Sequence, residues 1–396
     1  MAARFVPGAA HACRAAACAA AVLLAACSSM PSVNPLNWFG GSDSGAKPAE
    51  LPPLTHPQAV RLLWSANVGG AGAFILSPTL AGDSVYAASR EGTVVRLDAA
   101  TGKQHWRVAL ARGAISGAVG SDDRLAVVAT DKGEVITLDA ASGAERWRAR
   151  VSSEVLAAPL VAAGLVLVRS ADSRIFAFGA EDGKRRWVYQ RASSALIVRS
   201  PAGMTVGVDT VYAGFAGGKL VAIALSNGGA RWEATVALPK GATELERVTD
   251  IAGEPAVMGN EVCAAAFQGR IACYDLRNGN QLWARDLSTL TGASVDARFA
   301  YASDDKGAVH AYERASGRSV WKQDKLAHRR LTMPLPLESA VAAGDFQGQV
   351  HFMARDSGAF IARFATDGSA IRAAPVRLPG GLLVQTLNGG LYALSL

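Results

Sequence analysis

The sequence predicts an all-β fold, an eight-bladed β-propeller that is closed by its own two ends. Three observations lead to this prediction: a hairpin pattern that recurs about every 40 residues, a tryptophan that returns at one position of that pattern, and complementary halves of one repeat at the two ends of the chain. Repeats of this length that contain only strands and turns are typical of β-propellers.

Residues 92–106 show the pattern in full. Residues 94–97 are mostly apolar and β-branched, which suits a strand that is buried on both faces. Asp98 can accept hydrogen bonds from the backbone of the following turn, and Gly102 can adopt the positive φ that the turn requires. Trp106 then lies on the returning strand. The pattern is therefore a β-hairpin.

The hairpin recurs along the whole chain. It returns over residues 133–147, 173–187, 218–232, 269–283, 307–321 and 348–362, and an eighth copy begins at Gly389. The repeated tryptophan position holds Trp106, Trp147, Trp187, Trp232, Trp283 and Trp321, whereas the seventh copy has Ala362. Trp64 lies one period before Trp106, so we expect the N-terminal strand around Trp64 to complete the eighth blade by pairing with the C-terminal strands. These tryptophans are expected to be structural core residues rather than a ligand cage.

Residues 1–26 are predicted to be a secretory signal, because two arginines precede an Ala-rich apolar run that is too short to span a membrane. The run ends in Leu-Ala-Ala-Cys, which resembles the bacterial lipoprotein signal, and Cys27 would then be lipidated. An ordinary cleavage site beside an unrelated cysteine is the alternative. Ser28 follows where lipoproteins of the inner membrane often carry aspartate, so the resemblance implies an anchor in the outer membrane, on its periplasmic face.

Residues 27–58 are predicted to be a tether. Six prolines and several glycines and serines in this segment cannot build a packed element. Its one apolar patch includes Trp38 and Phe39, which could contact lipid or a partner, or have no role. The remaining residues, 59–396, are expected to form the propeller.

Composition and motifs argue against several function classes. The formal net charge is +7, and removal of Arg4 and Arg14 with the signal leaves 7 − 2 = +5. The basic residues are scattered through turns and form no stripe with interleaved aromatic residues, so nucleic acid is not an expected partner. The chain has no CxxC, HExxH or GxSxG motif, and its histidines lack metal-ligand spacing. We therefore expect no catalytic residues, no metal and no cofactor.

Two cysteines of the predicted propeller, Cys263 and Cys273, flank a hairpin turn almost symmetrically. Their strands could therefore place them side by side. In an oxidising periplasm a cross-strand disulfide is one outcome. Two buried free thiols are the other, because neighbouring cysteines do not always have bonding geometry.

The spacing between tryptophans lengthens in the middle of the chain. It is 41 and 40 residues up to Trp187, then 45 residues to Trp232 and 51 residues to Trp283. The extra residues fall in two consecutive connections between blades, which lie on the same face of a propeller. The first connection has apolar residues followed by Arg199, and the second has several carboxylates in residues 243–250. Such loops on a rigid scaffold suit a protein-binding surface, although long loops without a function are the alternative.

The Asp-x-x-Thr-Gly-x-x-x-Trp repeat, as in residues 98–106, resembles the tryptophan-docking repeat of pyrroloquinoline quinone dehydrogenases. This resemblance implies an alternative function, that of a periplasmic quinoprotein dehydrogenase or another ligand-binding propeller. Such enzymes usually carry adjacent cysteines and large loop insertions around the cofactor. The chain has neither, so we interpret the repeat as blade architecture rather than chemistry.

A more specific resemblance combines the lipoprotein signal, the tether, the eight repeats and two short motifs. Leu196-x-Val198-Arg199 and, in residues 247–250, Arg-Val-Thr-Asp are similar to motifs of the BamB family, lipoproteins of the outer-membrane β-barrel assembly machinery. The resemblance covers residues 24–396. It implies a non-enzymatic scaffold that is a monomer within a hetero-complex. Such a scaffold binds the periplasmic POTRA domains of BamA and assists the delivery and insertion of unfolded outer-membrane proteins.

By the same resemblance, Leu196, Val198, Arg199 and Asp250 would carry the contact with BamA. The aliphatic side chains would enter an apolar depression, while Arg199 and Asp250 would fix the orientation by charged hydrogen bonds. The family has a second aspartate two positions after Asp250, where this chain has Ala252. The acidic half of the contact is therefore expected to be weaker or rearranged.

Overall fold

The computed structural model describes Met1 and residues 47–110, 113–192 and 196–396. The chain divides into two compact units, Met1–Lys47 and Pro48–Leu396, and all strands of the described residues belong to the second. Cys27, Trp38 and Phe39 lie outside the described residues, together with residues 2–26 of the predicted signal. No helix in the described part of the chain is long and apolar enough to cross a membrane.

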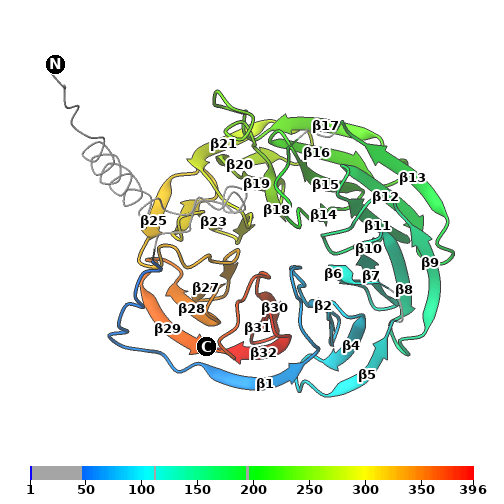
Figure 1. The fold of residues 1–396 in the computed structure, drawn as a ribbon, viewed down its shortest axis with the longest axis horizontal. Helices are drawn as coiled ribbons and strands as arrows, with labels where there is room; N and C mark the ends of the chain where they lie inside the picture. Colours follow the sequence, from blue (N-terminus) through cyan, green and yellow to red (C-terminus); the bar gives the residue numbers. More distant parts are fainter. Residues whose placement is uncertain (2–46, 111–112, 193–195) are drawn as a thin grey trace. The chain divides into compact units, whose positions relative to one another are not determined.

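Residues 48–396 form a ring of eight four-stranded antiparallel sheets (Figure 1). Each sheet is one blade, with its first strand nearest the ring axis and its fourth strand on the outer rim. The predicted eight-bladed propeller is therefore confirmed.

Blades 1 to 4 consist of β2 (Thr79–Ala81), β3 (Ser84–Ala88), β4 (Thr93–Asp98) and β5 (Gln104–Ala109); β6 (Ile115–Ser121), β7 (Leu125–Thr130), β8 (Glu134–Asp139) and β9 (Glu145–Arg150); β10 (Leu160–Ala162), β11 (Leu165–Ser170), β12 (Arg174–Gly179) and β13 (Arg185–Gln190); and β14 (Met204–Val206), β15 (Thr210–Phe215), β16 (Lys219–Ala224) and β17 (Ala230–Thr235). Blades 5 to 8 consist of β18 (Ile251–Met258), β19 (Glu261–Ala266), β20 (Gly269–Asp275) and β21 (Gln281–Leu287); β22 (Ala293–Val295), β23 (Phe299–Ser303), β24 (Val309–Glu313) and β25 (Ser319–Gln323); β26 (Leu335–Pro336), β27 (Ala340–Gly344), β28 (Gln349–Ala354) and β29 (Phe360–Ala365); and β30 (Val376–Leu378), β31 (Gly381–Gln385), β32 (Gly390–Ser395) and β1 (Arg61–Asn67).

The eighth blade takes strands from both ends of the chain. The order in its sheet is β1-β32-β31-β30, and β1 pairs with β32 in an antiparallel register that sets Trp64 opposite Ala393. Figure 1 shows the blue N-terminal strand β1 beside the red C-terminal strand β32. The predicted closure through the strand around Trp64 is confirmed.

The hydrophobic core lies between the blades. The second strands are buried on both faces, as in β7, where all residues are buried. One core cluster joins Leu125 and Val135 of blade 2 to Val166 and Phe176 of blade 3. Since every blade is covered on both sides, its inner strands need no polar face, which explains their continuous apolar runs.

Each repeated tryptophan on an outer strand reaches the turn after the third strand of the next blade. Its indole N–H donates to a backbone carbonyl there, over 2.6–3.1 Å, and the acceptors for Trp64, Trp106, Trp147, Trp187, Trp232, Trp283 and Trp321 are Ala99, Ala140, Ala180, Leu225, Leu276, Arg314 and Arg355. The tryptophan therefore links two blades by a hydrogen bond as well as by the apolar area that it buries.

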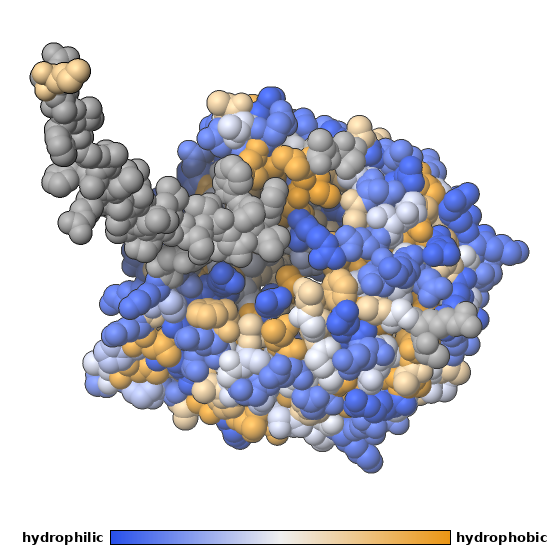
Figure 2. All heavy atoms as spheres, viewed as in Figure 1, coloured by the Kyte–Doolittle hydropathy of each residue, from blue (hydrophilic) through white to orange (hydrophobic). Residues whose placement is uncertain are grey.

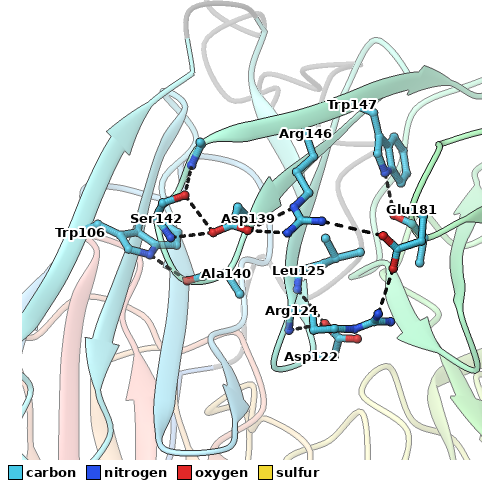
Figure 3. A network of polar contacts seen from close by, with 12 residues as sticks. Trp106, Asp122, Arg124, Leu125, Asp139, Ala140, Ser142, Arg146, Trp147 and Glu181 are labelled. Carbon is cyan, nitrogen blue, oxygen red and sulfur yellow. Dashed lines mark hydrogen bonds and ion pairs between the residues drawn. The ribbon is translucent and has the colours of Figure 1, made fainter.

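The aspartate of the repeat shapes the turn that receives this tryptophan (Figure 3). Asp139 Oδ1 accepts from the backbone N–H of Ser142 at 2.9 Å and from its hydroxyl at 2.8 Å. Arg146 Nη2 lies 2.6 Å from Asp139 Oδ2 and Nη1 lies 4.0 Å from Glu181 of the next blade. The hydrogen bonds from Arg146 and Ser142 lower the pKa of Asp139 to about 2. The turn therefore keeps its carboxylate ionised well into the acid range.

The glycine of the repeat has two tasks. Gly183 has a φ of +64°, in the region that favours glycine. In addition, a Cβ atom at Gly183 would lie 2.7 Å from the ring of Trp147, so the glycine makes room for the tryptophan of the preceding blade. The same approach recurs at the equivalent glycine of the other turns that receive a tryptophan.

Ala362 replaces the tryptophan in blade 7 for a structural reason. In blade 8 the third and fourth strands, β32 and β1, come from opposite ends of the chain, so no turn connects them. A tryptophan at position 362 would therefore have no turn on which to dock. Ala362 is instead fully buried in the cluster between blades 7 and 8.

Residues 48–58, which composition assigned to the tether, lie against blades 6 and 7, and we call this segment the strap. The backbone N–H of Ala49 donates to Ala327 O at 2.9 Å, and that of Gln58 donates to Ile361 O at 2.8 Å. Leu51 packs against the core cluster of these blades. The compact unit thus begins at Pro48 rather than at the expected residue 59. Prolines forbid a regular element here but leave their carbonyls free to accept hydrogen bonds.

A buried polar network in blade 7 holds the strap. Arg329 and Arg363 each donate to a strap carbonyl at 3.0 Å. Arg329 Nε donates to Asp345 Oδ2 at 2.7 Å, and Arg363 Nε donates to His351 Nδ1 at 3.3 Å. Because Nδ1 of the fully buried His351 accepts, its Nε2 carries the proton and donates to Asp345 at 2.9 Å.

This network predicts a loss of stability on mild acidification. Burial lowers the pKa of His351, and the positive charges of Arg363 and Arg329 act in the same direction. The hydrogen bond and the charge of Asp345 act in the opposite direction but do not outweigh them. The unfolded chain therefore takes up this proton first. The contribution of neutral His351 to the free energy of unfolding is complete above about pH 6.5. It is lost as the pH falls toward the folded-state pKa, by at most about 1.4 kcal/mol per pH unit.

The measurement is urea unfolding between pH 7.5 and 5.5. The His351→Gln variant is expected to be less stable at pH 7.5 and to lose less stability than the unaltered protein on acidification. His310→Gln, in the equivalent position of blade 6, is the control. Parallel pH profiles for the unaltered protein and His351→Gln would contradict the prediction.

Candidate functional site

The two enlarged connections lie on one face of adjacent blades. The first long loop, residues 191–203, leads into β14, and the second long loop, residues 236–250, leads into β18. Both precede the first strand of a blade, so they lie at the same end of the ring. Figure 2 shows an apolar area on the face in view over blades 4 and 5, with hydrophilic residues beside it.

Asp250 joins the two long loops. Its Oδ2 accepts a hydrogen bond from the backbone N–H of Val198 at 2.5 Å, and its Oδ1 accepts one from Gly217 at 3.3 Å. Asp250 is only 7% exposed. Burial raises the pKa of Asp250, and the two backbone amides and Arg169 partly offset this effect. The structure thus uses this carboxylate to hold the first long loop, rather than leaving it free on the surface as the sequence suggested.

Arg199 is exposed at the rim of the first long loop. Its Nη2 and Nε donate to Glu154 at 2.7 and 3.2 Å. The guanidinium also lies 5.8 Å from the centre of the Phe74 ring. The hydrogen bond with Glu154 raises the pKa of Arg199. A partner carboxylate would therefore find Arg199 oriented but already paired with Glu154.

The exposed aliphatic side chains differ from the predicted pair. Leu196 is 48% exposed and Ile197 is 41% exposed, whereas Val198 is partly buried and lines the cavity on the inner side of the loop. Leu245 of the second long loop is also exposed. Sequence reasoning missed Ile197 because the motif assigns it the variable position between two aliphatic residues.

Two further residues of the site, Glu154 and Arg169, had no signal in the sequence. Glu154 belongs to the connection before β10, and Arg169 lies within β11. Both line a cavity beneath the first long loop, together with Val198, Arg199 and Asp250. Their role depends on the meeting of three blades, which no local pattern records.

Away from this site, Cys263 and Cys273 form a disulfide between the paired strands β19 and β20. Within the described residues, no group of three or more histidine, cysteine, aspartate or glutamate side chains could hold a metal ion.

Comparison with known proteins identifies relatives along most of the chain. The family profile described as "Outer membrane protein assembly factor BamB" matches residues 58–116 and 90–323. The chain is 44% identical to outer membrane protein assembly factor BamB of Bordetella pertussis, over 90% of this chain and 92% of that protein. It is 42% identical to the protein of the same name from Burkholderia pseudomallei, over 95% and 96%.

Solved structures agree with these relatives. The crystal structure of BamB from Moraxella catarrhalis matches with a TM-score of 0.79 and 27% identity, over 85% of this chain and 100% of that chain. A quinohemoprotein alcohol dehydrogenase from Comamonas testosteroni matches with a TM-score of 0.66 but 14% identity, over 85% and 76%. The likeness to the dehydrogenase shows the fold alone, which makes that functional interpretation the weaker one. The sequence matches and the fold together place the chain in the BamB family of outer membrane protein assembly factors.

Proposed function

We propose that this protein is a non-enzymatic scaffold of the outer-membrane β-barrel assembly machinery that binds the POTRA domains of BamA through its two long loops. The observation that carries the proposal is the joining of these loops by the hydrogen bond to Asp250, beside which Leu196, Ile197 and Arg199 are exposed. Exposed aliphatic side chains beside an arginine are typical anchors of a protein interface.

The proposal gives each residue of the family motif a physical task. Leu196 and Ile197 would enter an apolar depression of the partner. Val198 would act from below, through its backbone N–H bond to Asp250. Arg199 would exchange Glu154 for a partner carboxylate, or bind beside it. In this proposal the missing second aspartate, at Ala252, costs little, because Ala252 is buried and Asp250 itself faces the loop.

The proposal also covers the N-terminal region. Residues 1–26 would be a signal peptide and Cys27 a lipidated residue in the outer membrane, so that the propeller, a monomer within the complex, acts at the periplasmic face. The tether would end where the strap begins at Pro48. Unfolded outer-membrane proteins would be the clients of the assembled complex.

Co-purification tests the docking surface. The Leu196→Ala/Arg199→Ala variant is expected to recover at least tenfold less BamA from solubilised membranes than the unaltered lipoprotein, while its melting temperature stays the same. The apolar anchor and the arginine are both exposed, so their truncation removes contacts with the partner rather than core packing.

A matched control exists on the opposite face of blade 4. Val208 is fully exposed in the turn after β14, and Arg231 is paired there with Asp209 at 2.6 Å. The Val208→Ala/Arg231→Ala variant removes the same types of side chain and should recover BamA normally. Normal recovery by the Leu196→Ala/Arg199→Ala variant would refute the proposed surface. Cofactor absorbance together with dye-linked dehydrogenase activity would instead support the quinoprotein alternative.

A further inference from the structure

A cavity of about 170 Å³ lies beneath the first long loop, where blades 3 and 4 meet. Leu156, Ile197, Val198 and Phe215 give it apolar walls, and Arg169 contributes a guanidinium. We call it the Arg169 cavity. Its volume has room for several water molecules, and therefore for one side chain rather than for a length of polypeptide.

Arg169 is a partly buried arginine that makes few contacts. Its Nη1 donates to Ala202 O at 3.0 Å, and its guanidinium carbon lies 4.8 Å from the centre of the Phe215 ring. No carboxylate of the described residues forms an ion pair with it. Burial lowers the pKa of Arg169 to about 10, with Asp250 acting in the opposite direction from a distance. The described residues thus provide a hydrogen-bond acceptor for one of the five N–H groups of this guanidinium, which lines the cavity.

Arg329 shows how the same chain treats a buried arginine with a structural task. Its Nε donates to Asp345 at 2.7 Å, its Nη2 donates to Gln347 at 2.6 Å, and its Nη1 donates to the strap. Its side chain is 3% exposed, and both ends of the guanidinium are satisfied. Arg169 differs in two ways: it is only partly buried, and no carboxylate of the described residues forms an ion pair with it.

The acidic residues near the cavity are committed elsewhere. Both oxygens of Asp250 accept backbone N–H bonds, and Glu154 is paired with Arg199 at the rim. Neither forms an ion pair with Arg169, although the negative charge of Asp250 acts to raise the pKa of Arg169. A carboxylate from outside would find a planar fork that suits bidentate binding, and apolar walls for the methylene groups that carry it.

We propose that the Arg169 cavity receives a glutamate or aspartate side chain of the partner that docks on the two long loops. This inference rests on the proposed docking function and names the chemistry that the partner must bring. The incoming carboxylate binds the guanidinium of Arg169 in bidentate fashion. Leu196 and Ile197 hold the apolar surface around it, so the buried ion pair is closed off from water.

The test is titration of the detergent-solubilised lipoprotein with the periplasmic POTRA domains of BamA. Arg169→Gln is expected to raise the Kd at least tenfold, and Arg169→Lys, which keeps the charge without the fork, by less. Arg231→Gln, which removes a positive charge on the opposite face of blade 4, should leave the Kd within twofold. Thermal melting of each variant separates lost binding from lost folding.

A second variant keeps Arg169 in place. Ala171 lines the cavity on a partly exposed turn, and Ala171→Leu should fill the space and weaken binding without lowering the melting temperature. On the partner, one acidic-to-amide substitution should weaken binding to the unaltered chain but have little further effect with Arg169→Gln. Glutarate is expected to bind the protein with 100-fold lower affinity than the POTRA domains do. Equal affinity would assign the cavity to a free small acid and overturn the proposal.

The outcomes distinguish this inference from the function on which it rests. Weakening by both Arg169→Gln and Leu196→Ala/Arg199→Ala supports both. An unchanged Kd for Arg169→Gln and Ala171→Leu, with weakening by the double variant, overturns the cavity proposal and leaves the docking surface intact. An unchanged Kd for all of them overturns both.

Discussion

Replacing Trp147 by alanine is expected to lower the free energy of unfolding by about 3 kcal/mol. The ring lies between blades 2 and 3, against Phe178 at 6.2 Å between ring centres, and its Nε1 donates to Ala180 O at 2.8 Å. Truncation removes the apolar contact and leaves that carbonyl without its donor. For a domain of this size the melting temperature should fall by about 5 °C, measured by calorimetry.

Trp147→Phe is the informative companion. It keeps an aromatic ring in the space between the blades but loses the indole N–H, so it should cost about 1 kcal/mol for the hydrogen bond, plus the smaller ring. If Trp147→Ala leaves the melting temperature unchanged, the tryptophan is not a link between blades and the packing argument is wrong.

The second large effect is expected for Gly183→Ala, at about 2–4 kcal/mol. Part of this cost is backbone strain, because φ is +64°, and part is overpacking, because the new Cβ would lie 2.7 Å from the Trp147 ring. Gly380 separates the two parts. It has a φ of +75° but no heavy atom within 4 Å of an added Cβ. Gly380→Ala should therefore show the backbone cost alone, about 1–2 kcal/mol.

A double-mutant cycle with Trp147→Ala tests this division directly. Once the ring is gone, the cost of Gly183→Ala should fall to that of Gly380→Ala. Urea unfolding of the four variants of the cycle gives the coupling energy. Equal costs of Gly183→Ala in the presence and absence of the tryptophan would mean that the glycine serves the backbone only.

The fold could be predicted because the repeat is governed by short-range physics. An apolar run, an aspartate that caps the turn, a glycine with positive φ and a returning tryptophan each act within one hairpin. The contact between the glycine of one repeat and the tryptophan of the preceding blade was not visible. Gly183 makes room for the ring of Trp147 in the preceding blade. These two residues are 183 − 147 = 36 positions apart in the sequence, so no local pattern reveals their contact. The strap was missed for a related reason, since its carbonyls find donors in Arg329 and Arg363, far along the chain.

The candidate site could be placed on its loops but not assembled. Spacing identified the two long loops, and a family motif identified four of their residues. Their geometry depends on how the two loops pack against each other. In the structure Asp250 accepts a hydrogen bond from the backbone N–H of Val198, and the side chain of Ile197 is exposed. Arg169 sits in an ordinary apolar strand, and Glu154 in an ordinary connection. A residue whose importance comes from a missing neighbour has no local signature.

Because each tryptophan docks on the turn of the following blade, the pattern of tryptophans can locate the chain termini in related sequences. The repeat without its tryptophan, at Ala362, is the one that precedes the sheet assembled from both termini. In any ring built on this rule, the gap in the aromatic series reports where the polypeptide begins and ends. The blade that combines the two termini can therefore be located from the spacing of the tryptophans alone.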